Sequence, residues 1–323
     1  MVKPYSSQEI ATLRALRQTL LGMEGRGEGE PAPAYWKNAE ALRLYDEVFA
    51  TRIVWKWNAA LDEVEERAPS AFRPRTLLDF GTGTGAASRT ILARIPKPER
   101  VVLVDRSAPA LAFAQQSLLA EHPDLELETR TSLGSGEFDL ALVSHVLDEL
   151  DDHQASALAG VLRGAQTVLW VEPGSKLTSR RLSGVRDALL DEFDVLAPCT
   201  HRAQCGILGP GHERDWCHFF ARPPAEVHTT ARWRQISDAL GIDLRSLPYA
   251  FLCLTKSTTD SQRTSTEPRR RVLGRPRVQR GRVLLDLCGP VGVETSQFLQ
   301  REHKDIYKAL KKDATTLRFE PPS

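Results

Sequence analysis

The segment Arg75–Ser88, RTLLDFGTGTGAAS, joins a short apolar run to a glycine-rich turn. Leu77 and Leu78 belong to a run of the kind that forms a buried strand. Glycines at the turn that follows allow the backbone to approach a ligand closely, and a helix that begins there adds the positive end of its dipole. The segment therefore predicts a strand, a ligand-binding loop and a helix.

Strands and helices alternate along the chain after this segment. The apolar runs RVVLVD (residues 100–105), FDLALVS (138–144) and TVLWVE (167–172) are separated by stretches of helical character. Such alternation is typical of βαβ units and a parallel sheet. We expect a doubly wound α/β domain over residues 73–260, with YAFLCLTKS (249–257) as its last strand.

The chain on either side of this domain has a different character. Residues 1–72 carry apolar side chains at helical spacing, which predicts an N-terminal helical region with a first helix capped by Ser7 and a second over residues 39–66. Residues 261–323 begin as a polar, arginine-rich tract and continue through RVLLDLCGPVG. They predict a small basic module that contains β-structure and ends in a short helix.

Two classes of cofactor bind to a glycine loop of this kind. The pattern Gly81-x-Gly83-x-x-Ala86 satisfies the dinucleotide fingerprint. The pattern Asp79-x-Gly81-x-Gly83-x-Gly85 closely resembles that of S-adenosylmethionine (SAM)-dependent methyltransferases, in which the acid at the strand end meets the ammonium group of the cofactor. Because the same acid would repel a pyrophosphate, we favour SAM over a dinucleotide.

Residues at the ends of the other strands extend the expected pocket. Asp105 can accept hydrogen bonds from both ribose hydroxyls, a role that serves either cofactor. Ser144 ends the expected strand FDLALVS, Glu172 ends the expected strand TVLWVE, and both border the same pocket. His145 acts either as a general base, since an ordinary histidine titrates near neutral pH, or as a structural residue of the pocket wall. The sequence lacks the Asn- or Asp-Pro-Pro-aromatic motif of enzymes that methylate the amino groups of bases.

Three of the five cysteines lie close together in Pro198–Cys217. Their spacing fits the close pairs of structural zinc sites poorly, and no base is evident for a catalytic thiol. Iron–sulfur clusters take four cysteines at varied spacings, although chance burial of three thiols is an alternative. Cys253 lies within an apolar strand and reads as a core residue, whereas Cys288 precedes a glycine and a proline on a turn. The expected cluster ligands, with zinc as the alternative metal, are Cys199, Cys205, Cys217 and Cys288.

Seven arginines and no acid occur between residues 268 and 282. Such a tract is either a solvated linker or a phosphate-binding surface. The residues expected to bind RNA are Arg269, Arg270, Arg271, Arg275, Arg277, Arg280 and Arg282.

Two further features bear on location. No run of about 18 apolar residues occurs, so we expect no membrane span. No targeting signal is evident at the N-terminus, and an odd number of cysteines disfavours a complete set of disulfides. These features predict a cytoplasmic protein.

Six motifs, taken in order, resemble those of the methyltransferase-like proteins associated with the mitochondrial ribosomal small subunit and of their bacterial relatives. The motifs are DFGTGTGAAS, SHVLDEL, WVEPGS, PCTHRAQC, DWCHFF and GRVLLDLCGPVG, and they cover roughly residues 35–310. The resemblance implies a Rossmann-like methyltransferase core and a [4Fe–4S] site at the four cysteines named above. It also implies a role in small-subunit assembly or translation. Gly206 departs from the family, whose members commonly have proline after the second cysteine.

Three functions follow from these features. The first is a SAM-binding, methyltransferase-like protein with a [4Fe–4S] cluster that acts on or with small-subunit ribosomal RNA. The second is a non-catalytic factor of small-subunit assembly in which SAM and the cluster are structural. The third is a small-molecule methyltransferase, which the arginine-rich tract disfavours.

Overall fold

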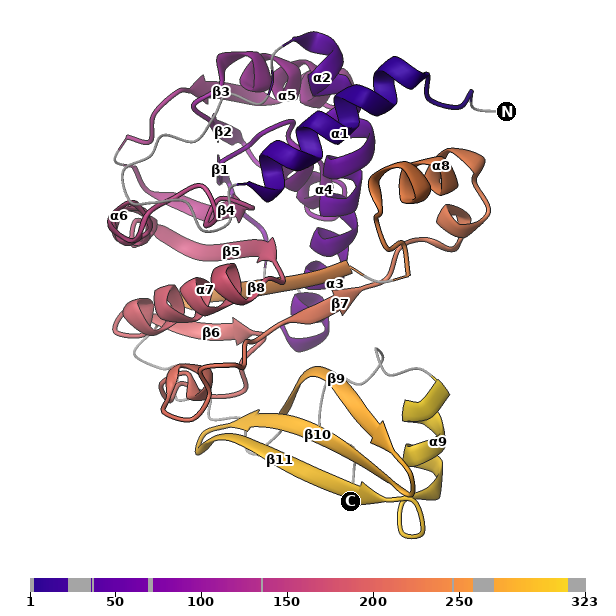
Figure 1. Ribbon diagram of the computed structural model, residues 1–323. Helices are drawn as coiled ribbons and strands as arrows, with labels where there is room; N and C mark the ends of the chain where they lie inside the picture. Colours follow the sequence, from indigo (N-terminus) through magenta and orange to yellow (C-terminus); the bar gives the residue numbers. More distant parts are fainter. Residues whose placement is uncertain are drawn as a thin grey trace.

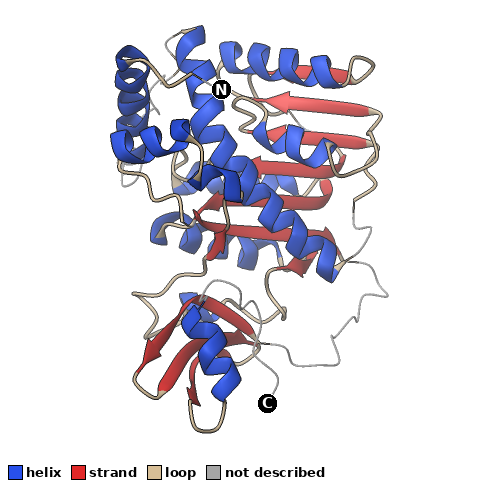
Figure 2. Ribbon diagram, turned by 90° about the vertical axis from the view of Figure 1, so that its right-hand side faces the viewer, coloured by secondary structure: helices blue, strands red, loops and turns tan. Residues whose placement is uncertain are grey.

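An eight-stranded sheet forms the centre of the protein, and helices cover both of its faces (Figure 1). A separate three-stranded sheet with one helix against it lies at one end of the molecule, as a second view confirms (Figure 2). The structure is a computed structural model that describes residues 3–22, 36, 38–68, 72–134, 136–245, 247–257 and 270–312. None of the helices in these ranges has both the length and the apolar character needed to cross a bilayer.

The strand order of the large sheet creates a switch point beside its first strand. The order is β3–β2–β1–β4–β5–β8–β6, with β7 paired to β8. Strands β1 to β5 run parallel, and β8 runs antiparallel to β5, β6 and β7. The bounds are β1 (Thr76–Phe80), β2 (Arg100–Val104), β3 (Glu126–Arg130), β4 (Phe138–Ser144), β5 (Ala165–Pro173), β6 (Phe193–Ala197), β7 (Phe219–Ala221) and β8 (Leu247–Lys256).

Strand β8 adds an antiparallel member to the parallel sheet that the sequence predicted. In the dinucleotide-binding fold, a parallel sixth strand follows the fifth. Here β8 lies between β5 and β6, and its residues Cys253 and Leu254 are fully buried. The continuous apolar run of β8 fits this place, because both of its edges are paired and both of its faces are covered. The protein thus has the Rossmann-like α/β fold of SAM-dependent methyltransferases, as the sequence predicted.

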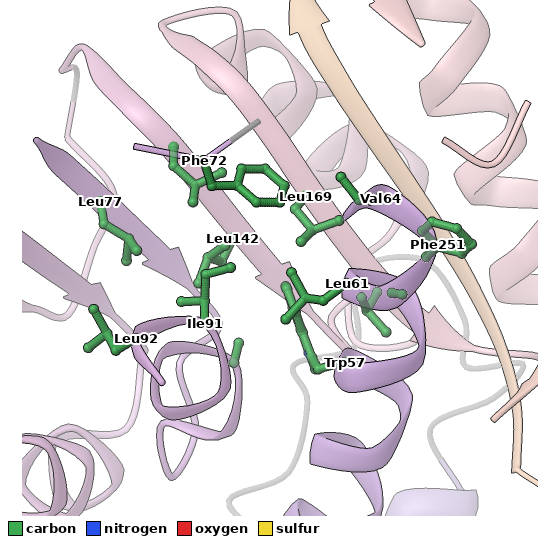
Figure 3. Close-up of a cluster of buried hydrophobic side chains, with 14 of the residues drawn as sticks. Trp57, Leu61, Val64, Phe72, Leu77, Ile91, Leu92, Leu142, Leu169 and Phe251 are labelled. Carbon is green, nitrogen blue, oxygen red and sulfur yellow. The ribbon is translucent and has the colours of Figure 1, made fainter. Parts of the chain in front are cut away.

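Helices cover the two faces of the large sheet in separate groups. Three helices share one buried cluster with the sheet: α3 (Thr51–Arg67), α4 (Ala86–Leu92) and α5 (Ala108–Glu121). The opposite face is covered by α6 (Asp152–Leu162) and α7 (Lys176–Leu189). On α3, side chains such as Trp57 and Leu61 project onto the sheet (Figure 3). Each large apolar side chain buried in this way contributes roughly 1.5–3 kcal/mol.

The N-terminal helical region is present, with two differences from the sequence expectation. Helix α1 (Ser7–Leu21) is capped by Ser6, whose side chain accepts from the Glu9 N–H while the Glu9 carboxylate accepts from the Ser6 N–H. This reciprocal pair requires a spacing of three residues, which Ser6 has and Ser7 lacks. The predicted second helix is divided into α2 (Ala39–Tyr45), a π-helical turn (Asp46–Ala50) and α3.

The N-terminal helices share a buried cluster with α8 (Ala231–Leu240), which belongs to the α/β domain. Residues such as Leu13 and Leu44 pack there with Ile236. Because this cluster crosses the predicted boundary at residue 72, the domain division into residues 1–72, 73–260 and 261–323 stays a prediction.

The C-terminal module has a small core of its own. It consists of β9 (Arg271–Gln279), β10 (Arg282–Gly289), β11 (Gly292–Leu299) and α9 (Lys304–Lys312). Apolar residues of the sheet, such as Val283 and Leu285, pack against Tyr307 and Leu310 of the helix. A buried ion pair joins this module to the large domain, since Arg271 of β9 binds Glu63 of α3 and lies over the ring of Phe219.

Candidate functional site

A cavity of about 490 Å³ opens at the carboxyl ends of β1, β2 and β4. In open α/β sheets, ligands bind in the crevice at this switch point, and the volume lies within the usual range of ~300–1,000 Å³ for small-molecule pockets. Of the residues predicted to bind a cofactor, its wall contains Gly81, Gly83, Asp105 and Ser144, and it also contains His145. Four of the seven residues predicted to bind a cofactor therefore lie together in the wall of one cavity.

Each glycine of the loop is needed for a different reason. Gly81 has φ +71°, and a Cβ atom there would lie 2.2 Å from Cγ1 of Val146. Gly83 has φ +53° and forms part of the cavity wall. Gly85 does not line the cavity: with φ +83° it starts α4, and a Cβ atom there would approach Cβ of Ala114 on α5 to 3.3 Å. The first two glycines shape the cavity, and the third brings two helices close together.

Asp105 is held against the glycine loop by two backbone hydrogen bonds. The Gly83 N–H donates to Oδ2 at 2.8 Å, and the Ser107 N–H donates to Oδ1 at 2.8 Å. Burial raises the pKa of Asp105, and these two hydrogen bonds oppose the rise because they favour the ionised form. Each carboxylate oxygen keeps a further lone pair, so Asp105 can still accept hydrogen bonds from a ligand in the cavity.

Asp79 lies behind the loop and is not part of the cavity wall. It is fully buried, and its Oδ2 accepts from the Ser88 hydroxyl at 2.6 Å and from the Ser88 N–H at 3.3 Å. Burial raises the pKa of Asp79 to about 7, and Oδ1 has no hydrogen-bond partner among the described residues. The sequence placed this carboxylate against a cofactor ammonium group, whereas the structure shows it fixing the start of α4.

Glu172 likewise supports the cavity from behind. Its Oε1 accepts from the indole N–H of Trp170 at 2.6 Å and from the backbone N–H groups of Val146 and Leu147 at 3.1 and 3.2 Å. Burial, followed by the nearby charge of Asp148, raises the pKa of Glu172 to about 8. Glu172 thus positions the chain after β4, which lines the cavity.

Several polar side chains meet at the end of β4. The sequence predicted Ser144 and His145 there but not Lys56. His145 has φ +54°, a backbone conformation uncommon outside glycine, and its Nε2 lies 3.1 Å from Nζ of Lys56 on α3. Ser144 accepts from the indole N–H of Trp57 at 2.9 Å. Burial and the neighbouring Arg52 lower the pKa of Lys56 to about 7, and burial together with the charge of Lys56 lowers that of His145. No local pattern marked Lys56, because its partner is distant in the sequence.

Replacing Lys56 by methionine is expected to reduce the rise of stability with pH above neutrality. The pKa of Lys56 is about 7 in the folded protein and 10.5 in a model peptide, so the unfolded chain binds more protons between these values. This group therefore makes folding more favourable as the pH rises from about 7 to about 10, by an amount on the order of a few kcal/mol. Urea unfolding across this range measures the effect, and an identical pH slope in both proteins would contradict it.

Four of the five cysteines come together from three separate segments. Cys199 follows β6, Cys205 precedes a short 3-10 turn, Cys217 precedes β7, and Cys288 is in β10. Burial raises the pKa of Cys217, and the thiols of the other three raise it further. Cys253 is fully buried in the sheet core, and none of these four thiols affects its pKa. The structure thus separates Cys253 from the other four cysteines, as predicted.

Cationic and polar groups surround the four thiols. Arg186 of α7 is almost fully buried and donates to the His201 carbonyl at 2.8 Å. Burial raises the pKa of Cys199, and the charge of Arg186 opposes this rise. Arg67 donates to the Cys199 carbonyl at 2.9 Å. Nε of Arg186 and Nη1 of Arg67 are buried without a hydrogen-bond partner among the described residues. Thiolates carry negative charge, so these two guanidinium groups suit a site that holds several of them.

The loop of Cys205 is packed tightly against the C-terminal module. A Cβ atom at Gly206 would lie 2.8 Å from Cα of Gly292, so the family's usual proline would clash in this conformation. Sγ of Cys288 lies 3.5 Å from Nε2 of His201. Within the described ranges, no three His, Cys, Asp or Glu side chains are arranged to hold a single metal ion.

The arginines of the tract have several different environments. Arg271 is buried in its ion pair with Glu63, so it does not belong to an exposed surface. Arg270 pairs with Glu294 at 3.2 Å, Arg277 pairs with Asp286, and Arg275 lies over the ring of Phe220. Arg280 and Arg282 are exposed on either side of the turn between β9 and β10. Arg269 lies outside the described residues.

The strand order and the cavity over the glycine loop define a methyltransferase-like α/β protein. The chain belongs to the Rsm22 family, described as mitochondrial small ribosomal subunit Rsm22, whose model matches residues 50–315. Membership of this family links the protein to the small ribosomal subunit. Because the family is described as mitochondrial, a cytoplasmic location stays a prediction.

Comparison with curated proteins found no match. Solved structures that match include the plantazolicin methyltransferase BamL in complex with SAH, at 11% identity over 78% of this chain and 97% of that chain, with a TM-score of 0.42. Magnesium protoporphyrin IX methyltransferase from Synechocystis PCC 6803 matches at 9% identity over 79% and 100%, with a TM-score of 0.40. The ribosomal protein L11 methylase from Lactobacillus delbrueckii subsp. bulgaricus matches at 15% identity over 63% and 79%, with a TM-score of 0.34.

Proposed function

We propose that this protein binds SAM in the cavity at the switch point and acts on or with small-subunit ribosomal RNA in ribosome assembly or translation. The observation that carries the proposal is the hydrogen bond from the Gly83 N–H to Asp105 at the wall of the cavity. It fixes a carboxylate at the end of β2, where a ribose is held in nucleoside-binding folds. Membership of a small-subunit family supports the ribosomal part.

The residues of the cavity have distinct roles in this proposal. Gly81 and Gly83 allow the ligand to approach the backbone, and Asp105 accepts from the ribose hydroxyls. Asp79 and Glu172 hold the two flanking loops in place from behind. When bound, SAM supplies an electrophilic methyl group, so the protein's task is to exclude water and to orient an acceptor.

A [4Fe–4S] cluster at Cys199, Cys205, Cys217 and Cys288 is the second part of the proposal. Its support is the convergence of four thiols beside the buried guanidinium of Arg186 and the half-buried one of Arg67. Iron–sulfur clusters are held by cysteine thiolates and respond to hydrogen bonds at their sulfurs. Zinc is the alternative metal for the same four ligands.

A non-catalytic role is the second candidate function, and the state of His145 favours it. Nε2 of His145 lies within hydrogen-bond distance of Lys56, and Nδ1 lies 3.4 Å from the Ser144 hydroxyl. Neither nitrogen is open to an acceptor unless one of these contacts breaks. A protein that uses SAM structurally would not need such a base.

Small-subunit ribosomal RNA provides the test of the ribosomal proposal. Purified protein should bind the RNA, and replacing both Arg280 and Arg282 by glutamine should lower the slope of log affinity against log salt by ~0.7–0.9 for each lost phosphate contact. We choose these two because they lie at the exposed turn, whereas Arg271 is part of the core. Absence of RNA binding by the unaltered protein would favour a small-molecule methyltransferase.

Methyl-labelled SAM then separates the two remaining candidates. Label that enters the RNA identifies an enzyme. RNA binding that is unaffected when SAM binding is lost, with no incorporation of label, identifies the non-catalytic factor.

A further inference from the structure

A groove of about 400 Å³ lies where the large domain meets the C-terminal module. Its wall is formed by α3, β7 and β8 of the large domain and by β9 of the module (Figure 1). The groove shares no wall residue with the cavity at the switch point. Four aromatic residues belong to its wall, namely Trp55, Phe219, Phe220 and Tyr249. Ligand sites commonly occur at such junctions, and the volume lies within their usual range of ~300–1,000 Å³.

Two arginines of β9 lie over two neighbouring rings of β7. The guanidinium carbon of Arg271 is 4.1 Å from the centroid of the Phe219 ring, and that of Arg275 is 4.3 Å from the centroid of the Phe220 ring. The first pair is structural, because Arg271 is buried and paired with Glu63. In the second pair Arg275 is exposed and Phe220 is half-buried, so this pair is accessible to a ligand.

The polar residues of the groove suit an anionic ligand with hydrogen-bonding edges. Arg222 belongs to the wall and is exposed, which places a second cation near Arg275 and Phe220. The acid in the wall, Asp62, is paired with Arg94 at 2.8 Å, so its charge is offset. The wall also contains the amide of Asn58, a group that both donates and accepts hydrogen bonds.

This combination matches the chemistry of unpaired nucleotides. Single-stranded RNA is bound by stacking its bases on aromatic rings and on guanidinium planes, while cations hold the backbone. A guanidinium that lies flat on a ring directs its N–H groups outward in its own plane, the geometry in which arginine binds phosphate. A duplex has its bases stacked on one another and cannot offer a base face to the groove.

We propose that this groove binds an unpaired nucleotide of single-stranded RNA, with the base on the rings of Trp55 and Phe220 and the phosphate held by Arg222 and Arg275. The inference deepens the proposed function and rests on its ribosomal part for the identity of the RNA. It depends neither on SAM nor on the cysteines.

Helix α3 connects the groove with the cavity at the switch point. Ile53 and Lys56 line the cavity, whereas Trp55 and Asn58 line the groove. An RNA strand held in the groove is thus separated from the proposed cofactor by one helix, which is about 10–12 Å across. This places the bound strand beside the cavity.

Two RNA probes test the stacking contact: a short oligouridylate, which has no secondary structure, and an RNA duplex of similar length. Phe220→Leu should weaken oligouridylate binding by roughly 5- to 150-fold, the range for loss of one stacked base, and leave duplex binding unchanged. Trp55→Leu should act in the same direction. Phe113→Leu makes the same change at a half-buried ring of α5 outside the groove and should leave both probes unaffected.

The salt dependence separates the ring from the cation. Phe220→Leu should lower oligouridylate affinity equally at every salt concentration, because it removes no charge. Arg275→Gln should lower the slope of log affinity against log salt by ~0.7 for one lost phosphate contact, and as a surface change it does not depend on the packing of a core. The control is Arg73→Gln, which removes an exposed arginine outside the groove and should leave the slope unchanged.

The outcomes distinguish this inference from the proposed function. If small-subunit RNA and oligouridylate bind equally well to the unaltered protein, Phe220→Leu and Arg275→Gln, the groove is not an RNA site and the proposed function stands. An equal loss of oligouridylate and duplex binding in Phe220→Leu would show a structural role and also overturn the inference. Groove-dependent binding of oligouridylate without binding of small-subunit RNA would support the groove and contradict the ribosomal proposal. Binding of neither RNA by the unaltered protein would overturn both.

Discussion

If the proposed cluster is present, Cys288→Ser is expected to lose iron, while Cys253→Ser keeps it. The thiol of Cys288 belongs to the group of four, since Cys199 and Cys205 raise its pKa after the effect of burial. Serine does not replace a thiolate as a ligand of iron, so three ligands remain and the cluster should be lost or depleted. Iron and sulfide assays on protein purified without oxygen measure this, with about four irons expected in the unaltered protein if the cluster is [4Fe–4S].

Cys253→Ser is the matched control because it makes the same chemical change at a thiol outside the group. Cys253 pairs with Leu169 and Ala197 in the sheet, so serine there should lower stability and leave the iron content unchanged. Full iron in Cys288→Ser together with loss of iron in Cys253→Ser would show that the fourth ligand is Cys253. Zinc in place of iron in the unaltered protein would identify the alternative metal.

Gly83→Val is expected to abolish SAM binding. Gly83 has φ +53°, which a β-branched residue adopts only with strain, and a Cβ atom there would lie 3.5 Å from the ring of Trp36, another residue of the cavity wall. The same change would strain the backbone that carries the Gly83 N–H, the donor to Asp105. Calorimetry should therefore show no heat of binding of S-adenosylhomocysteine (SAH) at concentrations that saturate the unaltered protein.

A glycine away from the cavity provides the control for this variant. Gly160 lies within α6, and a Cβ atom there would have no neighbour within 4 Å. Gly160→Ala should bind SAH normally and should be as stable as the unaltered protein or slightly more stable. Normal binding by a folded Gly83→Val would place the cofactor elsewhere.

The parts of the fold that the sequence predicted are those with local signals. Each of these signals lies within about ten residues of sequence. They are the glycine loop between β1 and α4 and the apolar runs of β1, β2, β4, β5 and β8. By contrast, β3 has the sequence ELETR and lies at the edge of the sheet, so it lacks an apolar run that would mark it. The position of β8 between β5 and β6 is a long-range property, which alternation of strands and helices does not specify.

The residues of the candidate site likewise differ in how well the sequence predicted them. The sequence predicted Gly81, Gly83 and Asp105 as site residues because each lies in a turn that directly follows an apolar strand. Lys56 was not, because it belongs to an amphipathic helix and its contact with His145 joins residues 89 positions apart. A local pattern gives the order of residues along a strand but not which of them face a cavity.

The arginine-rich tract shows how composition alone can mislead. From the sequence, seven arginines were predicted to form one RNA-binding surface because all of them are cationic. In the structure Arg271 is buried against Glu63, which lies 208 positions earlier in the chain. Removing one member of a buried pair typically costs about 3–5 kcal/mol of stability. A substitution at Arg271 would therefore report on the junction between the two sheets and not on RNA.

The most direct test of the account is calorimetric titration of the unaltered, purified protein with SAH and, separately, with NADH. The choice between them depends on the antiparallel β8, which stands where a dinucleotide-binding domain has a parallel sixth strand. We predict that SAH binds with one molecule per chain and that NADH produces no heat of binding. Tight binding of NADH with no binding of SAH would contradict the account.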